Sequence, residues 1–394
     1  MRIKVVPEDF RVEERIDLPR DPAGVYALYR VEKRGVTTPT VERRLARELH
    51  RRPAAIQFPG LKDKRAVAVQ YVTVKGGGPE RVEGRGFTAQ RVGHSAERLQ
   101  PAHLVGNQFT VTVRDLDPAD AAALGPTLFR LSEEGVPNYF DQQRFGSQTR
   151  DGDLPGKRIF QRDAEGALHA HLAERLAGDP RRLRTFKRTA ADHWEDWDRI
   201  FDAAPSPSNF RSVLTYLRDH PTAGVPERDR YFRRALNLVT TRVLRIYIQA
   251  YQSLLWNRIV ARYLVRQFGA PPASVPIAQE ALPFYPDLAD RVAIDAVPMP
   301  YHRARYRDPD LAAVVREVLR EEGFELNDLK PRILERAYLP RGTRPLFLFP
   351  ADVSATDPVP DERFSGSHRV ALTFTLPPGA YATLVIKAVA ALAV

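Results

Sequence analysis

The sequence of 394 residues contains no cysteine. This absence excludes disulfide bonds, thiolate catalysis and every zinc or iron–sulfur site that needs cysteine ligands. Long hydrophobic runs are also missing, so no segment predicts a membrane span, and the stretch Met1 to Phe10 does not have the pattern of a signal peptide. We therefore expect a cytoplasmic protein that does not associate with a membrane.

Lysine is scarce, since only nine of the 60 basic residues are lysine and the rest are arginine. The formal net charge is +11 and the isoelectric point is about 9.9. Arginine favours a polyanionic partner such as RNA, because its planar guanidinium matches phosphate and stacks on bases. High-GC coding or a thermophilic source explains the same composition, so charge alone does not decide between the two interpretations.

Hydrophobic residues make up 43% of the chain and charged residues 28%, as in ordinary soluble globular proteins. The length exceeds what one small core needs, so it predicts two domains or one domain with a large insertion.

The first part of the chain mixes strand and helix patterns. Strands are predicted over Gly24 to Lys33, Ala66 to Val74 and Asn107 to Arg114. A helix is predicted over Pro118 to Glu134, with Asp117 as its N-cap and a break at Gly125–Pro126.

A basic helix is predicted after Thr40, which is its expected N-cap, because Val41, Leu45 and Leu49 recur at helical spacing. Its other faces carry Arg43, Arg44, Arg47, Arg51 and Arg52. Such a run is either an RNA contact or a solvated helix face.

The middle of the chain is predicted to be mostly helical, with helices over Glu165 to Leu176 and Thr240 to Gln267 separated by proline-rich connections. Strand patterns resume at Leu346 to Phe349 and Val370 to Leu376. We expect an α+β fold in which 1–154 and 336–394 share a mixed or antiparallel sheet and 155–335 is a mostly helical insertion.

The segment Gly60 to Val67, GLKDKRAV, places one carboxylate, Asp63, among three cations, and Gln70 follows in the next strand. Neighbouring cations lower the pKa of a carboxyl and keep it ionised, the form that a nucleophile or a general base requires. A polar β-turn whose Asp bonds to its own backbone is the alternative interpretation.

The Gly-x-Lys-Asp-Lys pattern, with Ala-Val and Gln downstream, resembles the signature of the TruD family of pseudouridine synthases. By that resemblance Asp63 is the catalytic nucleophile and Lys62 is a neighbouring active-site cation. Ala68 departs from the pattern, because the family usually has Thr there.

Two further segments resemble TruD motifs. Lys4 to Glu13, KVVPEDFRVE, is similar to the N-terminal Pro-Glu-Asp-Phe segment, which implies that Lys4 and Phe10 reach the catalytic pocket. Gly135 to Gly146, GVPNYFDQQRFG, is similar to Asn-Tyr-Phe-Gly-x-Gln-Arg-Phe-Gly, with Asp141 where Gly is usual. A positive φ at that turn would be harder for Asp than for Gly. The residues that match, and are implied to bind substrate, are Asn138, Phe140, Gln143, Arg144 and Phe145.

Two later segments complete an ordered set of five matches. Gln252 to Leu264, QSLLWNRIVARYL, resembles the family helix with Ser-x-Leu-Phe/Trp-Asn, and Leu376 to Lys387, LPPGAYATLVIK, resembles Leu-Pro-x-Gly-x-Tyr/Phe-Ala-Thr. Lys387 stands where Arg is common.

The resemblance implies a pseudouridine synthase catalytic domain with an inserted helical domain, acting on tRNA at position 13 of the D arm as a monomer. The reaction needs no cofactor and no metal, because it only transfers the C1′ bond of uracil from N1 to C5. Asp63 either attacks the sugar or removes a proton from it. A flipped uracil needs an aromatic clamp, for which Phe10 and Phe140 are candidates, and Asn138 is expected to pair with its edge.

Several other functions were considered. His169 and His171 lack a third metal ligand, and GDLPGKR at Gly152 to Arg158 has one residue too few for a phosphate loop. A nuclease would need clustered carboxylates to hold two metals. A non-catalytic RNA-binding or RNA-folding protein with the same fold remains the alternative, although the intact Lys62–Asp63 pair argues against it.

Overall fold

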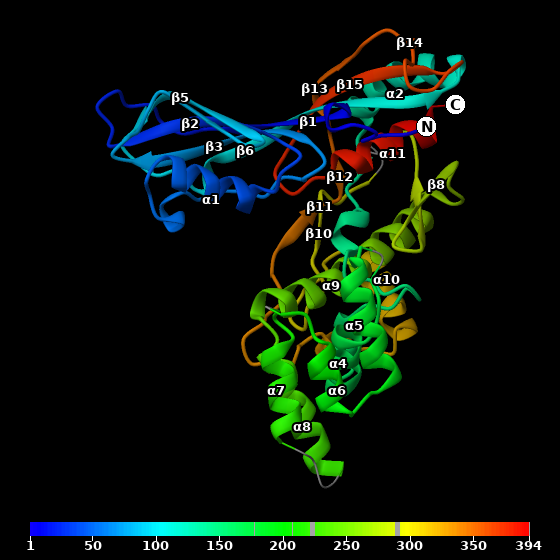
Figure 1. Cartoon of the computed structure of the whole chain (residues 1–394). Helices are drawn as coiled ribbons and strands as arrows, with labels where there is room; N and C mark the ends of the chain where they lie inside the picture. The colour runs from blue at the N-terminus through cyan, green and yellow to red at the C-terminus, as the bar shows by residue number, and fades with distance from the viewer. Residues whose placement is uncertain (177, 207, 221–224, 288–291, 394) are drawn as a thin grey trace. The chain divides into compact units, whose positions relative to one another are not determined.

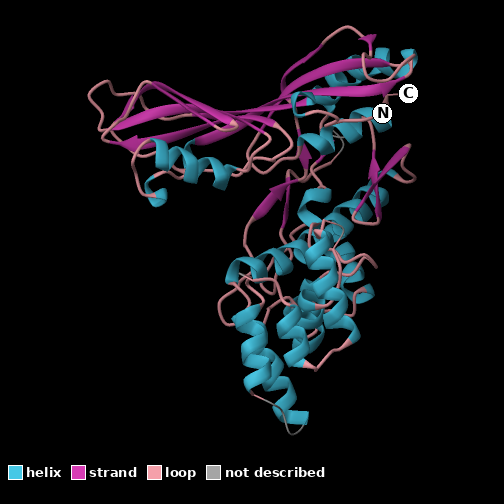
Figure 2. Ribbon diagram, in the orientation of Figure 1, coloured by secondary structure: helices cyan, strands magenta, loops and turns pink. Residues whose placement is uncertain are grey.

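In the computed structural model, which describes residues 1–176, 178–206, 208–220, 225–287 and 292–393, the chain forms two compact units. Unit 1 comprises Met1–Val136, Pro286–Asp290 and Leu348–Val394, and unit 2 comprises Pro137–Tyr285 and Arg291–Phe347. Figure 2 shows that strands dominate the first and helices the second. The expected α+β class with a mostly helical insertion is confirmed.

Unit 1 is built on one sheet of nine strands among the described residues, in the order β13-β15-β6-β1-β3-β2-β5-β4, with β14 also paired to β15. Figure 1 shows β15, from near the end of the chain, alongside β6 and β1 from its beginning. The strands are β1 (Phe10–Ile16), β2 (Tyr26–Arg34), β3 (Val67–Lys75), β4 (Arg81–Gly84), β5 (Phe87–Ser95), β6 (Leu104–Leu116), β13 (Ala351–Ala355), β14 (Val359–Pro360) and β15 (His368–Leu376).

The neighbours β1 and β3 are parallel, with Arg11 opposite Val67 and Glu13 opposite Val69, whereas the other pairings of this sheet are antiparallel. The starts of two parallel strands lie at the same edge of a sheet. The 3₁₀ turn η1 (Pro7–Asp9) precedes β1, and the turn that contains Asp63 precedes β3. The pairing therefore brings two motifs that are far apart in sequence to one edge.

Helix α1 (Thr38–Glu48) packs its apolar side on this sheet, where Val41 and Leu45 join a core cluster with Tyr29 and Val72. The predicted N-cap at Thr40 is wrong, since the helix starts earlier and Thr37 occupies the cap position. The reason is Pro39. Proline lacks an N–H group, and it is well suited to the first turn of a helix because N–H groups there have no partner within the helix.

Helix α2 (Pro118–Glu134) has Asp117 as its N-cap, as predicted, and Asp117 accepts a hydrogen bond from the Asp120 N–H. The predicted break at Gly125–Pro126 is wrong, because the helix continues through Pro126. Burial of Leu124, Leu128 and neighbouring positions against the sheet and α11 (Ala382–Leu392) offsets the hydrogen bond that proline removes.

Unit 2 is organised around α9 (Thr241–Phe268), whose side chains are buried on nearly every face and which contacts α3 and α10. The other helices are α3 (Pro155–Phe160), α4 (Ala164–Leu172), α5 (Arg181–Asp192), α6 (Trp197–Ala203), α7 (Arg211–Asp219), α8 (Val225–Leu238) and α10 (Pro309–Glu321). Two small antiparallel pairs accompany them, β8 (Ala273–Ile277) with β9 (Glu280–Phe284) and β10 (Ala296–Pro298) with β11 (Thr343–Pro345). None of the described helices, α9 included, is both long and apolar enough to cross a membrane.

The first boundary between the units lies earlier in the chain than the sequence predicts, and the last boundary lies later. The first and last cuts fall after Val136 and after Phe347, near the two-residue strands β7 (Val136–Pro137) and β12 (Phe347–Leu348), rather than after residues 154 and 335. The motif from Pro137 to Gly146 therefore belongs to the helical unit. Its backbone is held there, because the Asn138 N–H donates to Leu346 O at 2.9 Å.

Candidate active site

Asp63 lies in the turn between η2 (Pro53–Ala55) and β3, with 38% of its side chain exposed. Its Oδ1 accepts a hydrogen bond from the Arg65 N–H at 2.9 Å, which closes a local Asx turn. Its Oδ2 accepts one from Lys4 Nζ at 2.7 Å. The carboxylate is thus oriented by two donors and still faces solvent.

Lys4 reaches Asp63 from a strained backbone, since its φ of 58° lies in the left-handed region that lysine rarely adopts. Its Nζ also lies 4.1 Å from the centroid of the Phe10 ring, within cation–π range. Phe10 is 5% exposed and packs edge-on against Phe109. Phe10 therefore supports the ammonium that holds Asp63.

Lys33 holds the same turn from beneath and was not singled out by the sequence. Its Nζ donates to the main-chain oxygens of Asp63 at 2.7 Å and Val36 at 3.1 Å, and the side chain is 2% exposed. Burial lowers the pKa of Lys33 to about 8; the charge of Asp63 opposes this shift and that of Lys62 adds to it.

The surroundings favour an ionised Asp63. Partial burial raises the pKa of its carboxyl, but the hydrogen bonds from Lys4 and from the Arg65 N–H, with the charges of Lys4 and Lys33, more than offset this effect. The pKa of Asp63 consequently lies below its ordinary value of 3.8.

Lys62 has a different partner from the one expected for it. Its Nζ pairs with Glu14 Oε1 at 2.7 Å, and the Glu14 side chain is fully buried. Gln70 Nε2 donates to the same oxygen at 3.0 Å and to Gly60 O at 2.8 Å, while Thr38 Oγ1 donates to Gln70 Oε1 at 2.8 Å. Lys62 thus connects the turn to β1, β3 and α1 instead of contacting the Asp63 carboxylate.

A cavity of about 260 Å³ adjoins this turn in unit 1, and its lining includes Lys4, Lys64 and Arg65. Three cations around a small open hollow favour an anionic group such as a phosphate. The cavity lies beside the residue that orients Asp63.

The motif residues of unit 2 form a second cluster. Asn138 is 5% exposed, and its amide is occupied, since Oδ1 accepts from Arg344 Nη2 at 2.6 Å and Nδ2 donates to Pro345 O at 3.1 Å. The Arg344 guanidinium lies 4.1 Å from the Phe140 ring centroid. Asn138 therefore orients Arg344, which no sequence motif indicated.

Phe140 and Phe145 are buried, at 7% and 1% exposure. The Phe140 ring meets Trp256 edge-on with centroids 5.6 Å apart, and its main-chain N–H and oxygen bond to the Asn257 side chain, each at 2.8 Å. Helix α9 thus fixes this loop through Asn257, a contact that the sequence did not predict.

The rest of the loop is more open. Arg144 Nε donates to Ser253 Oγ at 3.0 Å, and Gln143 is exposed. Asp141 has φ −90° and caps η4 (Gln142–Phe145) by accepting from the Gln142 N–H. A positive φ is not needed here, so Asp in place of Gly causes no backbone strain.

Lys4, Phe10, Lys62 and Asp63 belong to unit 1, and Asn138, Phe140, Gln143, Arg144 and Phe145 to unit 2. That both groups serve one substrate stays a prediction. His169 and His171 diverge, because His171 is buried and bonded to Tyr247 Oη at 2.7 Å whereas His169 packs on Trp194. Within the described residues no three histidine or acidic side chains gather as metal ligands.

Comparison with known proteins tests the family resemblance. The model of the family TruD, tRNA pseudouridine synthase D, matches residues 1–271. The chain belongs to the TruD family. A TruD relative from Aquifex aeolicus, named tRNA pseudouridine synthase D, is 29% identical over 98% of this chain and 97% of its own.

Other TruD relatives cover the chain as fully. The protein of the same name from Syntrophotalea carbinolica is 28% identical over 98% of this chain and 95% of its own. The crystal structure of a TruD candidate from Methanosarcina mazei superposes with a TM-score of 0.74 at 22% identity, covering 98% of this chain and 92% of that one. That structure supports the fold of both units.

Proposed function

We propose that this protein is a tRNA pseudouridine synthase that isomerises uridine 13 of the D arm, with Asp63 as its catalytic residue. The observation that carries the proposal is the half-exposed carboxylate of Asp63, kept ionised by Lys4 and by the backbone of its own turn. Membership of the TruD family supports the choice of tRNA and of the reaction.

The reaction breaks the C1′–N1 bond, turns the freed uracil and joins its C5 to C1′, after which C5 loses its proton and N1 gains one. Substrate and product contain the same atoms, so no redox partner is needed. An ionised carboxylate can serve in two ways: it can attack C1′ and later leave, or it can remove a proton from the sugar. Both require the unprotonated form that the surroundings of Asp63 favour.

Each neighbour has a proposed role that follows from its contacts. Lys4 orients Asp63 and, with Lys64 and Arg65, attracts the phosphate next to the target uridine. Phe10 holds Lys4 in place, and Lys62 fixes the turn through Glu14.

In unit 2 we assign the substrate contacts to Gln143, Arg144 and the Arg344 guanidinium. Asn138, Phe140 and Phe145 are buried and support these side chains, so we assign Phe140 a supporting role rather than that of an aromatic clamp. The sequence predicts that Asn138 pairs directly with uracil. We do not assign it that role, because the Asn138 amide is already bonded to Arg344 and Pro345.

The test is to replace Asp63 by Asn, which keeps the shape and removes the charge. We expect pseudouridine formation on unmodified tRNA, mapped by carbodiimide primer extension, to fall at least about 10³-fold while tRNA affinity stays within about threefold of wild type. The matched control is Asp115→Asn, because Asp115 also lies in unit 1 and also pairs with a cation near the start of the chain, Arg2 at 3.1 Å.

Equal modification by wild type and Asp63→Asn contradicts the role of Asp63. Tight tRNA binding by a wild type that forms no pseudouridine would favour the alternative, a non-catalytic RNA-binding protein of the same fold.

A further inference from the structure

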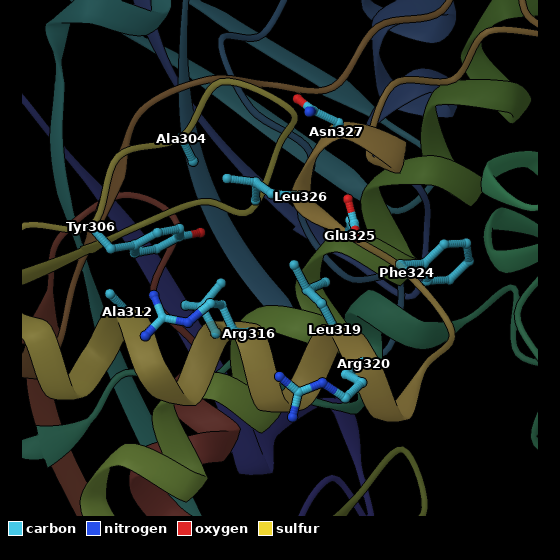
Figure 3. A pocket seen from close by; sticks show the side chains of 11 residues that line it. Ala304, Tyr306, Ala312, Arg316, Leu319, Arg320, Phe324, Glu325, Leu326 and Asn327 are labelled. Atoms are coloured by element: carbon cyan, nitrogen blue, oxygen red, sulfur yellow. The ribbon is translucent and has the colours of Figure 1, made fainter.

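A second cavity, of about 590 Å³, lies wholly within unit 2. It is bounded by α10, by the segment that precedes this helix and by η6 (Leu326–Asp328), as Figure 3 shows. Its floor is apolar and includes Ala312, Val315, Leu319 and Leu326. The volume falls in the range of ordinary small-ligand sites, about 300–1,000 Å³.

The hydroxyl of Tyr306 is buried and has no hydrogen-bond partner among the described residues. Figure 3 shows it directed into the cavity. The hydroxyls of two other buried tyrosines of unit 2 do have partners, since Tyr139 donates to Pro283 O and Tyr251 to Glu322. A buried polar group without a partner requires an explanation, and a ligand that fills the cavity supplies one.

Acidic and basic residues of α10 lie on different faces of the helix. Glu317 and Glu321 pair with Arg266 and Arg262 of α9, at 2.8 Å and 2.5 Å. Arg316 and Arg320 line the cavity instead. They are one turn apart and exposed, and their side chains form no hydrogen bond or ion pair in the described part of the chain. The helix therefore presents two adjacent, unneutralised guanidinium groups at the rim.

We infer that this cavity binds one nucleotide of an RNA, with the base against the apolar floor and its phosphate held by Arg316 and Arg320. Tyr306 Oη and the exposed Asn327 amide are placed to bond to the base edge, and Glu325 at the mouth can accept from an exocyclic amino group. Two guanidinium groups can bind a phosphate, and an apolar surface can bind a base. A nucleotide has both groups, so it fits this cavity better than a free phosphate or a free base does. The inference rests on the proposed function in taking the RNA to be tRNA.

The first test removes the phosphate contacts in the full-length protein. We expect Arg316→Ala/Arg320→Ala to raise the Kd for unmodified tRNA at least about tenfold and to reduce the slope of log K against log salt by about one. The matched control is Arg332→Ala/Arg336→Ala, which removes the same charge from exposed arginines of unit 2 that do not line the cavity.

The second test leaves the charge unchanged. Tyr306→Phe removes the unsatisfied hydroxyl, so we expect an unchanged or higher thermal midpoint together with a Kd for tRNA raised about threefold to tenfold and an unaltered salt slope. Ala312→Trp fills the floor and should weaken binding at least as much.

Wild-type affinity in both the arginine and the tyrosine variants overturns the inference, and so does equal weakening by the control pair, which would indicate general charge attraction. A wild type that binds tRNA but forms no pseudouridine overturns the proposed activity alone. The binding measurements would still decide about the cavity.

Discussion

At the scale of single residues, the fold strongly shifts the protonation equilibrium of Lys33. The side chain is buried beneath the Asp63 turn and its pKa is lowered to about 8, against 10.5 for an ordinary lysine. Between these two values the unfolded chain binds more protons than the folded one at this position. Lys33 therefore lowers stability below pH 8, and this penalty disappears as the pH rises from about 8 to 10.5.

Comparing Lys33→Met with wild type tests this. The variant lacks the titration, so the free energy of unfolding of wild type relative to Lys33→Met should increase by about 1 kcal/mol per pH unit between pH 8 and 10. Urea unfolding at four pH values measures it. Lys75→Met removes an exposed lysine from the end of β3 and should give pH curves parallel to wild type. Parallel curves for Lys33→Met as well would contradict the lowered pKa.

Some residues of the candidate site could be predicted from the sequence and others could not. Asp63 was found because its motif is local, and Lys4 because a second motif contains it. Lys33, Glu14 and Arg344 were missed, because each acts through a partner far away in the sequence. Lys33 occupies an ordinary position in an alternating strand, where an outward-facing lysine is the usual expectation.

At the scale of elements, the network of Glu14, Lys62, Gln70 and Thr38 connects β1, β3, α1 and the Asp63 turn. Lys62 is only 11% exposed and Glu14 is fully buried. Removing one member of a buried ion pair leaves the other charge uncompensated.

We therefore expect Glu14→Gln to destabilise unit 1 by about 3–5 kcal/mol. The double variant Glu14→Gln/Lys62→Met, which removes both charges, should recover at least half of that loss. Denaturant midpoints for wild type, both single variants and the double variant form the cycle. Additive effects of the two substitutions would show that the pair is not coupled.

The positions of helices and strands were predicted better than the pairing of the strands in the sheet. The helical pattern located α2 and α9 to within a few residues. Alternation located β2 and β6, and strand-like segments located β3 and β15. The parallel contact of β1 with β3 has no local signal, because it depends on strand order within the finished sheet. The break expected at Pro126 was wrong because packing on the sheet keeps α2 continuous, and the cap expected at Thr40 was wrong because Pro39 is favoured in the first turn of α1.

At the scale of the whole molecule, the excess of positive charge is carried mostly by arginine. Several arginines are already paired with acids, as Arg114 is with Asp9 and Asp361 and Arg258 with Glu280. Composition therefore overstates the charge that is available to RNA. It also cannot locate the unit boundaries, which follow the backbone contacts near Val136 and Phe347.

If tRNA binding uses about six phosphate contacts, its affinity should fall about 10³-fold between about 50 and 200 mM salt. Filter binding at constant pH gives this slope. An affinity that does not change with salt would mean that the arginine-rich surface does not contact the tRNA backbone. Repeating the titration with Asp63→Asn should give the same slope, since that substitution removes a negative charge which contacts no phosphate.

Lys33 donates a hydrogen bond to the main-chain oxygen of residue 63, so this contact with the turn does not depend on the side chain at that position. Whatever side chain occupies the position, that oxygen is present and the buried ammonium can bond to it. An inactive Asp63 variant should thus keep its turn folded and remain a receptor for uncleaved uridine. Such a protein is a substrate trap, suited to capturing natural RNA targets from a cell extract before any bond is broken.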